Sequence, residues 1–287
     1  MKISNSQIMS LQTCERRFYY EHILKLKPKQ FPEAVEGGLF GHEMFEVFFK
    51  AMQQGFSYDE CAKELNPIIE KNLNNLELLS RYRHVLAFGT YAFQQEWEVV
   101  SCEESVLFEI EEGLEFAYTP DLIIRWNTGT KRGTRAALDF KFTGQYWTPK
   151  ELGVFQQLPK YMIYQNKIND EEIAHCGVVM LNTRAAAGAT GQDLFKIGWL
   201  NLTKKKLQRI ELENETMMRR VAIVKEIYKP ENYMRTVNTF TCKLCWFAEK
   251  LCPMEMEGRD TSRVLKHSYE HNKYFEENYE IEEAKND

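Results

Sequence analysis

Three polar side chains in the middle of the chain have the types and spacing of a metal-dependent hydrolytic site. Asp121 follows Pro120 in an apolar, β-rich run, and Asp139 and Lys141 stand two residues apart in the next such run. Because side chains two apart on a strand leave the same face, Asp139 and Lys141 are expected to point the same way. Two converging carboxylates can bind Mg²⁺ or Mn²⁺, and a lysine beside them can hold an attacking water or a phosphate oxygen. A solvated strand edge also fits this pair, so the surrounding elements carry the interpretation.

Strands that would position these side chains are indicated by β-branched and aromatic runs bounded by turn residues. Asp121 lies in a strand predicted over 114–125, and Asp139 and Lys141 lie in one over 134–142. The polar, glycine-containing connection between the two strands predicts a hairpin. Further strands are expected at 106–110, 173–181 and 194–202.

Helices are predicted on both sides of these strands from periodicity and capping residues. One begins at Ser4 or Ser6, and another carries His42 and Glu46 four residues apart on one face. A third begins at Thr148 with Glu151 completing a capping box. The expected ranges are 4–24, 38–52, 58–76, 77–98, 148 onward and 203–229, with a loop at 28–37.

Composition and charge limit the choice of partner. The 287 residues, 44% of them hydrophobic, allow a substantial core. A net charge of −5 argues on average against a nucleic-acid partner, although local basic clusters allow either a basic channel or solvated helix faces. An apolar run of about eighteen residues and an export segment are both absent from the sequence, so we expect a cytoplasmic protein without a membrane span. The basic clusters lie at 81–84, 131–135, 204–206 and 219–220.

Three of the seven cysteines lie close together near the C-terminal end of the chain. Cys242, Cys245 and Cys252 follow the spacing Cys-x₂-Cys-x₆-Cys-Pro. A Cys-x₂-Cys turn aims both sulfurs at one point, which in a reducing compartment predicts a metal site. This spacing leaves zinc and unligated thiols open as alternatives to an iron–sulfur cluster. Small buried side chains are expected at Cys61, Cys102 and Cys176.

Taken in order, these motifs resemble the iron–sulfur subset of RecB-like PD-(D/E)XK nucleases, which includes the AddB nuclease domain and CRISPR-associated iron–sulfur exonucleases. The family order is an N-terminal cysteine, a Gly-x-x-Gly-His histidine, Pro-Asp, Asp-x-Lys before Thr-Gly, Gln-x-x-x-Tyr and three cysteines. Here these motifs correspond to Cys14, His42, Asp121, Asp139 with Lys141, Gln157 with Tyr161, and Cys242, Cys245 and Cys252.

The resemblance implies a role for each motif. His42, Asp121, Asp139 and the backbone carbonyl of Phe140 would bind Mg²⁺ or Mn²⁺, with Glu46 as a weaker candidate beside them. Lys141 would position the nucleophile. Gln157 and Tyr161 would border the active site and contact DNA, although Pro159 between them would kink a continuous helix. A [4Fe–4S] cluster, or zinc in its place, would be held by Cys14, Cys242, Cys245 and Cys252.

The fold implied by the resemblance is α/β, with a restriction-endonuclease-like core of a mixed central sheet flanked by helices, a helical annex and a C-terminal iron–sulfur segment. A single nuclease domain would span 1–259, and a charged tail would span 260–287. Within the domain we expect the annex at about 50–100, the core at about 101–202, and the long helix and cysteine cluster at 203–259.

The implied function is a metal-dependent DNA nuclease, with exonuclease action preferred, in recombination, repair or DNA processing. Its partner would be DNA that is single-stranded or has free ends. The sequence has no helicase-type phosphate loop, so a helicase or recombination protein would be a separate chain. A catalytically silent iron–sulfur module that binds DNA or a protein partner is the alternative, and a zinc-bound scaffold is a third.

Overall fold

The computed structural model describes residues 1–236, 242–243 and 245–272 and divides the chain into two compact units. The terminal unit comprises Met1–Phe31, Leu107–Tyr118 and Glu213–Asp287. The central unit comprises Pro32–Val106 and Thr119–Leu212. Each unit is described by itself below.

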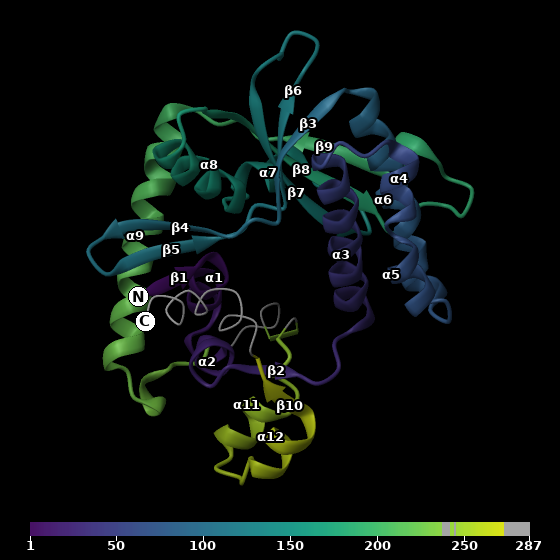
Figure 1. The fold of residues 1–287 in the computed structure, drawn as a ribbon. Helices are drawn as coiled ribbons and strands as arrows, with labels where there is room; N and C mark the ends of the chain where they lie inside the picture. Colours follow the sequence, from purple (N-terminus) through teal and green to yellow (C-terminus); the bar gives the residue numbers. More distant parts are fainter. Residues whose placement is uncertain (237–241, 244, 273–287) are drawn as a thin grey trace, which may run out of the picture. The chain divides into compact units, whose positions relative to one another are not determined.

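A five-stranded mixed sheet organises the central unit (Figure 1). The third and fourth strands of the sheet pair in parallel, and the three remaining neighbouring pairs are antiparallel. This arrangement confirms the expected mixed sheet. The strands, in their order across the sheet, are β3 (Trp97–Cys102), β6 (Leu122–Trp126), β7 (Arg135–Thr143), β8 (Ile173–Asn182) and β9 (Phe195–Trp199).

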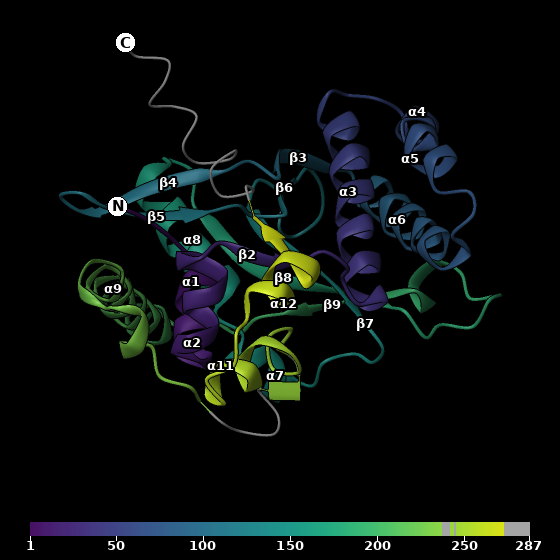
Figure 2. The same cartoon turned by 90° about the horizontal axis from the view of Figure 1, so that it is seen from below.

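Helices cover both faces of this sheet. On one face, α3 (Glu33–Gln53) and α6 (Leu76–Gln94) pack against an aromatic core, in which the rings of Phe45 and Phe140 stack with centroids 4.0 Å apart. On the other face, α8 (Gln157–Ile168) packs against Cys176 of β8. Two short helices, α4 (Tyr58–Lys63) and α5 (Asn66–Lys71), lie in the chain between α3 and α6 (Figure 2).

Glycine at two positions lets α3 approach its neighbours closely. A Cβ on Gly41 would lie 2.0 Å from the ring of Phe142 on β7, and one on Gly89 of α6 would lie 2.4 Å from the ring of Phe48. A methyl group cannot fit at either distance. Gly41 therefore lets the middle of α3 lie close against β7, directly beside His42.

Several predicted boundaries were wrong. The helix expected to reach residue 98 ends at Gln94, and the alternating, largely buried segment that follows forms β3. The long strand over 114–125 is two strands, β5 (Leu114–Tyr118) and β6. The predicted loop over 28–37 ends early, because α3 begins at Glu33.

The terminal unit contains a three-stranded sheet with β5 at its centre. The strand β1 (Lys2–Ser4) pairs with β5 in parallel, and β4 (Val106–Glu111) lies on the other side of β5. The capping box of Ser4 and Gln7 begins α1 (Asn5–Thr13), as expected for this start. The helix predicted to continue to residue 24 is interrupted, because Cys14 is extended (φ −166°, ψ 117°) before α2 (Glu15–Phe18).

The long helix α9 (Lys204–Ile227) matches the helix predicted over 203–229. Beyond the cysteine segment, α11 (Leu251–Met256) and α12 (Ser262–Ser268) lead to β10 (Tyr269–His271), which pairs antiparallel with β2 (Leu26–Pro28). The first part of the predicted charged tail therefore forms α12 and β10, and residues 273–287 lie outside the described part of the chain. Among the helices that the structure describes, none has the length and hydropathy of a membrane span.

Candidate metal centre and cysteine pocket

The hairpin of β6 and β7 brings the two predicted aspartates together. Its register pairs Leu122 with Leu138, so Asp121, just before β6 begins, lies beside Asp139, the residue after Leu138 on β7. Both side chains are buried, with exposed fractions of 8% for Asp121 and 1% for Asp139. The backbone N–H of Phe140 donates to Oδ2 of Asp121 at 2.7 Å, which fixes that carboxylate.

The third predicted metal ligand, His42, reaches the same place from α3. Its Nδ1 lies 3.6 Å from Oδ2 of Asp121 and 3.5 Å from Oε1 of Glu103. Burial would lower the pKa of His42, but the hydrogen bond with Glu103 and the charge of Asp121 outweigh it and raise the pKa. The structure thus places His42 beside Asp121, as the resemblance implied.

Glu103 belongs to this group, although no motif in the sequence indicated it as a ligand. It follows β3 with a φ of +51°, a backbone conformation that is uncommon outside glycine, and its N–H donates to the carbonyl of Asp121 at 3.2 Å. Ligand atoms of His42, Glu103 and Asp121 all lie within 4.8 Å of one another and could hold a metal ion. By contrast, the weaker candidate Glu46 accepts a bond from Lys50 at 2.5 Å and is not in this group.

Asp139 stands next to the group of three and faces Lys141, whose Nζ lies 2.7 Å from its Oδ2. Burial, with the charge of Asp121 next, raises the pKa of Asp139 to about 7 despite Lys141. Within the part of the chain that the structure describes, Oδ1 of Asp139 accepts no hydrogen bond. If all three carboxylates ionise and His42 is neutral, as a metal ligand must be, Lys141 leaves two negative charges that a divalent cation would balance.

Gln157 and Tyr161 share one face of a helix, and Pro159 does not disturb it. The predicted single helix is two: α7 (Pro149–Val154) ends before a break, and α8 begins at Gln157. Pro159 therefore lies in the first turn of α8, where a missing N–H removes no helical hydrogen bond. The amide Nε2 of Gln157 donates to the Tyr161 hydroxyl at 3.1 Å.

The terminal unit brings all four predicted cysteine ligands to one small pocket, which also contains three arginines. The break at Cys14 between α1 and α2 places this residue opposite the C-terminal cysteines. Two sulfurs there accept hydrogen bonds: Arg235 Nε donates to Cys252 at 3.2 Å, and the N–H of Thr236 donates to Cys14 at 3.4 Å. The pocket is lined by Cys14, Arg16, Arg17, Tyr20, Arg235, Thr236, Cys242, Cys245, Phe247, Ala248 and Cys252.

One carboxylate connects the walls of the cysteine pocket. Oε2 of Glu255 accepts from Arg16 at 2.5 Å, from the Tyr20 hydroxyl at 2.5 Å and from Arg235 at 2.7 Å. These bonds join the N-terminal helices to α11, more than 200 residues away in the chain. Burial and the bond to Glu255 raise the pKa of Tyr20, so its hydroxyl keeps the proton that it donates.

The remaining cysteines are as expected. Cys61, Cys102 and Cys176 are buried in the central unit, and burial raises the pKa of each thiol. None of the three lines the cysteine pocket.

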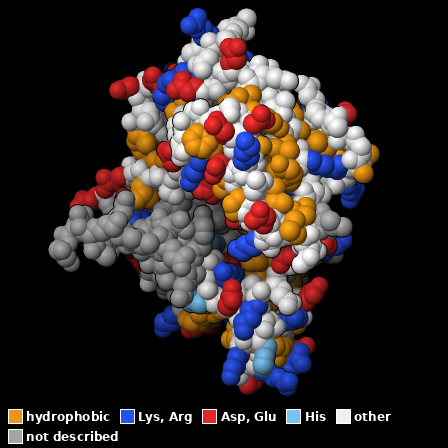
Figure 3. Space-filling model, turned by 45° about the vertical axis from the view of Figure 1, so that its right-hand side comes forward, with side chains coloured by type: hydrophobic (Ala, Val, Ile, Leu, Met, Phe, Trp, Pro, Cys, Tyr) orange, Lys and Arg blue, Asp and Glu red, His pale blue; other side chains and the backbone are white. Residues whose placement is uncertain are grey.

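The basic clusters seen in the sequence are mostly committed to internal contacts. Arg83 donates to the backbone carbonyls of Ala185, Ala186 and Ala187, and Lys131 lies over the rings of Trp126 and Trp199. On the face shown in Figure 3, basic and acidic side chains alternate between hydrophobic ones.

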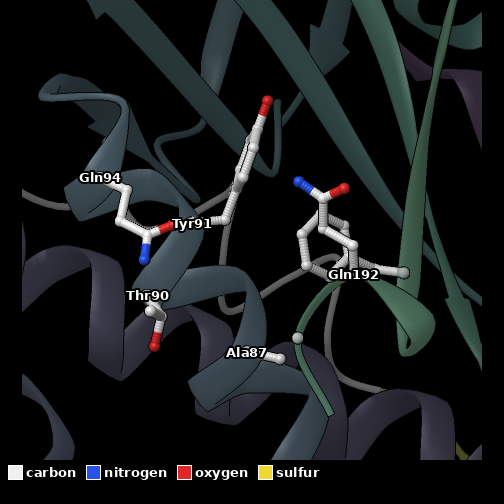
Figure 4. Close-up of a pocket in the computed structure, with 7 residues that line it drawn as sticks. Ala87, Thr90, Tyr91, Gln94 and Gln192 are labelled. Atoms are coloured by element: carbon white, nitrogen blue, oxygen red, sulfur yellow. The ribbon is translucent and has the colours of Figure 1, made fainter. Parts of the chain in front are cut away.

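A second hollow of the central unit lies between α6 and the connection from β8 to β9. Figure 4 shows Tyr91 and Gln94 of α6 on one side and Gln192 on the other. Its lining includes no charged side chain and no histidine or cysteine, so it offers neither an acid–base pair nor a metal site. The lining residues are Ala87, Thr90, Tyr91, Gln94, Gly191, Gln192 and Phe195.

Comparison with known proteins gives one family over nearly the whole chain. The profile of the PD-(D/E)XK nuclease superfamily matches residues 2–253. Among solved structures, the crystal structure of SSO0001 is similar at 15% sequence identity and a TM-score of 0.40, over 88% of this chain and 85% of that one. No curated protein matches the chain.

Proposed function

Since the chain belongs to the PD-(D/E)XK nuclease superfamily, we propose that it is a metal-dependent deoxyribonuclease that hydrolyses phosphodiester bonds as an exonuclease. Nucleases of this superfamily typically use Mg²⁺ or Mn²⁺. The observation that carries the proposal is the buried pair of Asp121 and Asp139, with His42 and Lys141 beside it. Burying two carboxylates together is unfavourable unless a cation is bound there.

The metal would be held by His42, Asp121 and Asp139, with Glu103 added to the set that the resemblance implied. The carbonyl of Phe140 would be a further donor. The N–H of Phe140 donates to Asp121, so the backbone groups of Phe140 face the side on which Asp121 precedes β6. When bound, a divalent cation acts as a Lewis acid on the phosphate and lowers the pKa of water.

The side chains around the metal position and neutralise the reacting groups. Burial lowers the pKa of Lys141, but Asp139 and Asp121 outweigh it and raise the pKa, so Lys141 is a permanent cation. Its ammonium can orient the attacking water and stabilise charge that develops on the phosphate. Gln157 and Tyr161, fixed by their mutual hydrogen bond, would contact Lys141 or the DNA strand.

We also propose that Cys14, Cys242, Cys245 and Cys252 bind a [4Fe–4S] cluster. The support is that all four line one pocket with three arginines, which suit an anionic thiolate group. A single zinc ion would hold four sulfurs about 3.8 Å apart, as follows from a Zn–S distance of about 2.3 Å. Within the described residues, the four cysteines form no three-ligand group as tight as 4.8 Å, whereas His42, Glu103 and Asp121 do. Metal analysis of anaerobically purified protein, for iron against zinc, decides between the two.

The test is cleavage of end-labelled linear DNA, single- and double-stranded, by anaerobically purified protein in Mn²⁺ or Mg²⁺. Asp139→Asn should reduce cleavage by at least about 10²-fold, because a neutral amide cannot replace the carboxylate. Asp170→Asn, at an exposed position, is the matched control and should cleave normally. A ladder shortening from one end would establish the exonuclease and its polarity.

The alternative is a silent module that binds DNA without cutting it. Protein with a full iron complement that binds DNA but gives no metal-dependent cleavage would establish this alternative and reject the nuclease. A separate helicase or recombination protein would then remain a candidate partner. Adding such a protein should change the affinity of this protein for DNA.

A further inference from the structure

Two aromatic rings stand directly beside the lysine of the proposed active site. The Nζ of Lys141 lies over the ring of Phe155, 5.8 Å from its centroid. The ring of Phe155 in turn contacts that of Trp147, with centroids 5.5 Å apart and planes inclined by 60°. Both aromatics flank α7, so Lys141, Phe155 and Trp147 form a continuous row within the central unit.

The short helix that carries these rings is fixed to the sheet on one side. The N–H of Trp147 donates to the sulfur of Met180 on β8 at 3.0 Å. Gly198 of β9 leaves room for Leu152, since a Cβ at that position would lie 2.7 Å from the leucine side chain. The capping box of Thr148 and Glu151 holds the first turn. The rings are therefore presented by a rigid support.

The side of α7 that faces away from the sheet is exposed to solvent. None of its residues is buried, and Val154, next to Phe155, is 73% exposed. Trp147 and Phe155 are only partly buried. Rings that are fixed in place and partly open to solvent are suited to stacking on a flat ligand.

A positive charge flanks this segment on the side of β7. Gly144 follows β7, and a Cβ there would lie 2.7 Å from Nε of the exposed Arg184. In the described ranges, Arg184 forms no ion pair. Lys141 and Arg184 thus offer two cations near the aromatic rings, a combination that matches the flat base and the phosphates of a nucleotide.

We propose that Trp147 and Phe155 form a stacking subsite for the unpaired nucleobase next to the phosphate held at Lys141, and that Arg184 binds a neighbouring phosphate. The inference rests on the proposed function and names its substrate: single-stranded DNA or a frayed end. In a duplex both faces of an internal base are already stacked, so only an unpaired base offers a face to the rings.

The experiment compares binding of two labelled 12-mers to full-length protein in EDTA, where no cleavage occurs. One is oligothymidylate, and the other is the same backbone with abasic sites throughout. Stacking of about 1–3 kcal/mol per base corresponds to about 5- to 150-fold in affinity. Wild type should bind oligothymidylate more tightly by a factor in this range, and Trp147→Ala or Phe155→Leu should lose most of that preference while binding the abasic strand unchanged.

The controls separate stacking from folding and from the proposed function. Phe155→Leu keeps an apolar side chain of similar size, so it tests the ring even where Trp147→Ala does not fold. Trp199→Ala removes another tryptophan, 39% exposed on β9, and should keep the preference. Variants that keep the full preference for bases would overturn the stacking subsite and leave the nuclease intact. A wild-type protein that binds neither strand would also overturn the stacking subsite, whereas the nuclease is decided separately by metal-dependent cleavage of end-labelled DNA.

Discussion

The two candidate metal sites of this protein are built on opposite principles. The carboxylate site of the central unit takes His42, Glu103, Asp121 and Asp139 from elements that pack on one aromatic core. The cysteine pocket of the terminal unit takes its sulfurs from both ends of the chain. We therefore expect the carboxylate site to keep its shape whether or not it holds an ion, and the cysteine pocket to depend on the cluster proposed there.

The supporting contacts show the same contrast. Beneath the carboxylate site, Phe140 stacks on Phe45, and Gly41 sets the distance between α3 and β7. Around the cysteines, the walls are joined by polar contacts through Glu255 and by the packing of Tyr20 on Phe247, with centroids 4.8 Å apart. Polar contacts that are partly exposed contribute little net stability, whereas a metal bound by four thiolates contributes much more. Removing each ligand should therefore affect the two units very differently.

The largest expected effect follows Cys252→Ser. If the proposed cluster is bound, loss of one thiolate should remove its iron and weaken the connection of the N-terminal helices to α11, so the terminal unit should unfold at a lower temperature. Mn²⁺ affinity of the carboxylate site should change less than about twofold, because its ligands lie in the central unit. Iron content, thermal unfolding and Mn²⁺ titration measure these effects.

Cys176→Ser is the matched control, since this cysteine lies outside the pocket and should leave the iron content unchanged. If Cys252→Ser lost Mn²⁺ affinity as well as iron, the contrast between the two sites would be wrong.

A smaller effect is expected of pH on the Mn²⁺ affinity of the carboxylate site. Because burial raises the pKa of Asp139 to about 7, its carboxyl is protonated below that pH in the metal-free protein. A metal ligand must be deprotonated, so loss of the Asp139 proton should raise Mn²⁺ affinity about fivefold from pH 6 to 7 and about twofold from pH 7 to 8. Deprotonation of His42, whose pKa is also raised, should make the rise steeper. Titration calorimetry at several pH values measures this slope.

The same pKa has a linked effect on the metal-free protein. A carboxyl whose pKa is raised on folding from its ordinary 3.8 makes the folded state lose stability as pH increases from about 4 to 7. Asp139→Asn should remove that loss, and an identical pH dependence of unfolding in this variant would contradict the assignment.

The smallest effect concerns the strained backbone at Glu103. A glycine there relieves the positive φ, so Glu103→Gly should stabilise the metal-free protein by up to about 1 kcal/mol. It should also weaken Mn²⁺ binding, by about tenfold, because one carboxylate is lost. Denaturant unfolding and Mn²⁺ titration measure the two changes.

Glu104→Gly removes the adjacent carboxylate, where φ is not positive, and should destabilise the protein slightly while binding Mn²⁺ normally. A Glu103→Gly variant with unchanged Mn²⁺ affinity would leave the carboxylate site with His42 and the two aspartates alone.

The parts of the site that could be predicted from the sequence are those determined by residues close together in the chain. The juxtaposition of Asp121 and Asp139 follows from the period of a strand and one hairpin, so the sequence predicted it. Glu103 was missed because its position depends on the pairing of β3 with β6 and on a positive φ, which an ordinary glutamate does not signal.

The breaks in helices were harder to predict than the helices themselves. Cys14 interrupts a continuous helical pattern because tertiary contacts hold it extended, as when the N–H of Arg16 donates to the carbonyl of Met234. Pro159 was expected to kink a helix, but the chain starts a new helix at Gln157 and so places the proline where it is harmless. Local preference indicated a helix in both cases, and the boundaries were decided by the rest of the fold.

The fit of Gly41 against Phe142 has a consequence for how this chain can change over generations. A larger side chain at residue 41 would push α3, and with it His42, away from β7. Substitutions at 41 are therefore expected to survive only where residue 142 has become smaller. The two positions should behave as an epistatic pair, each harmful to change alone and tolerable to change together.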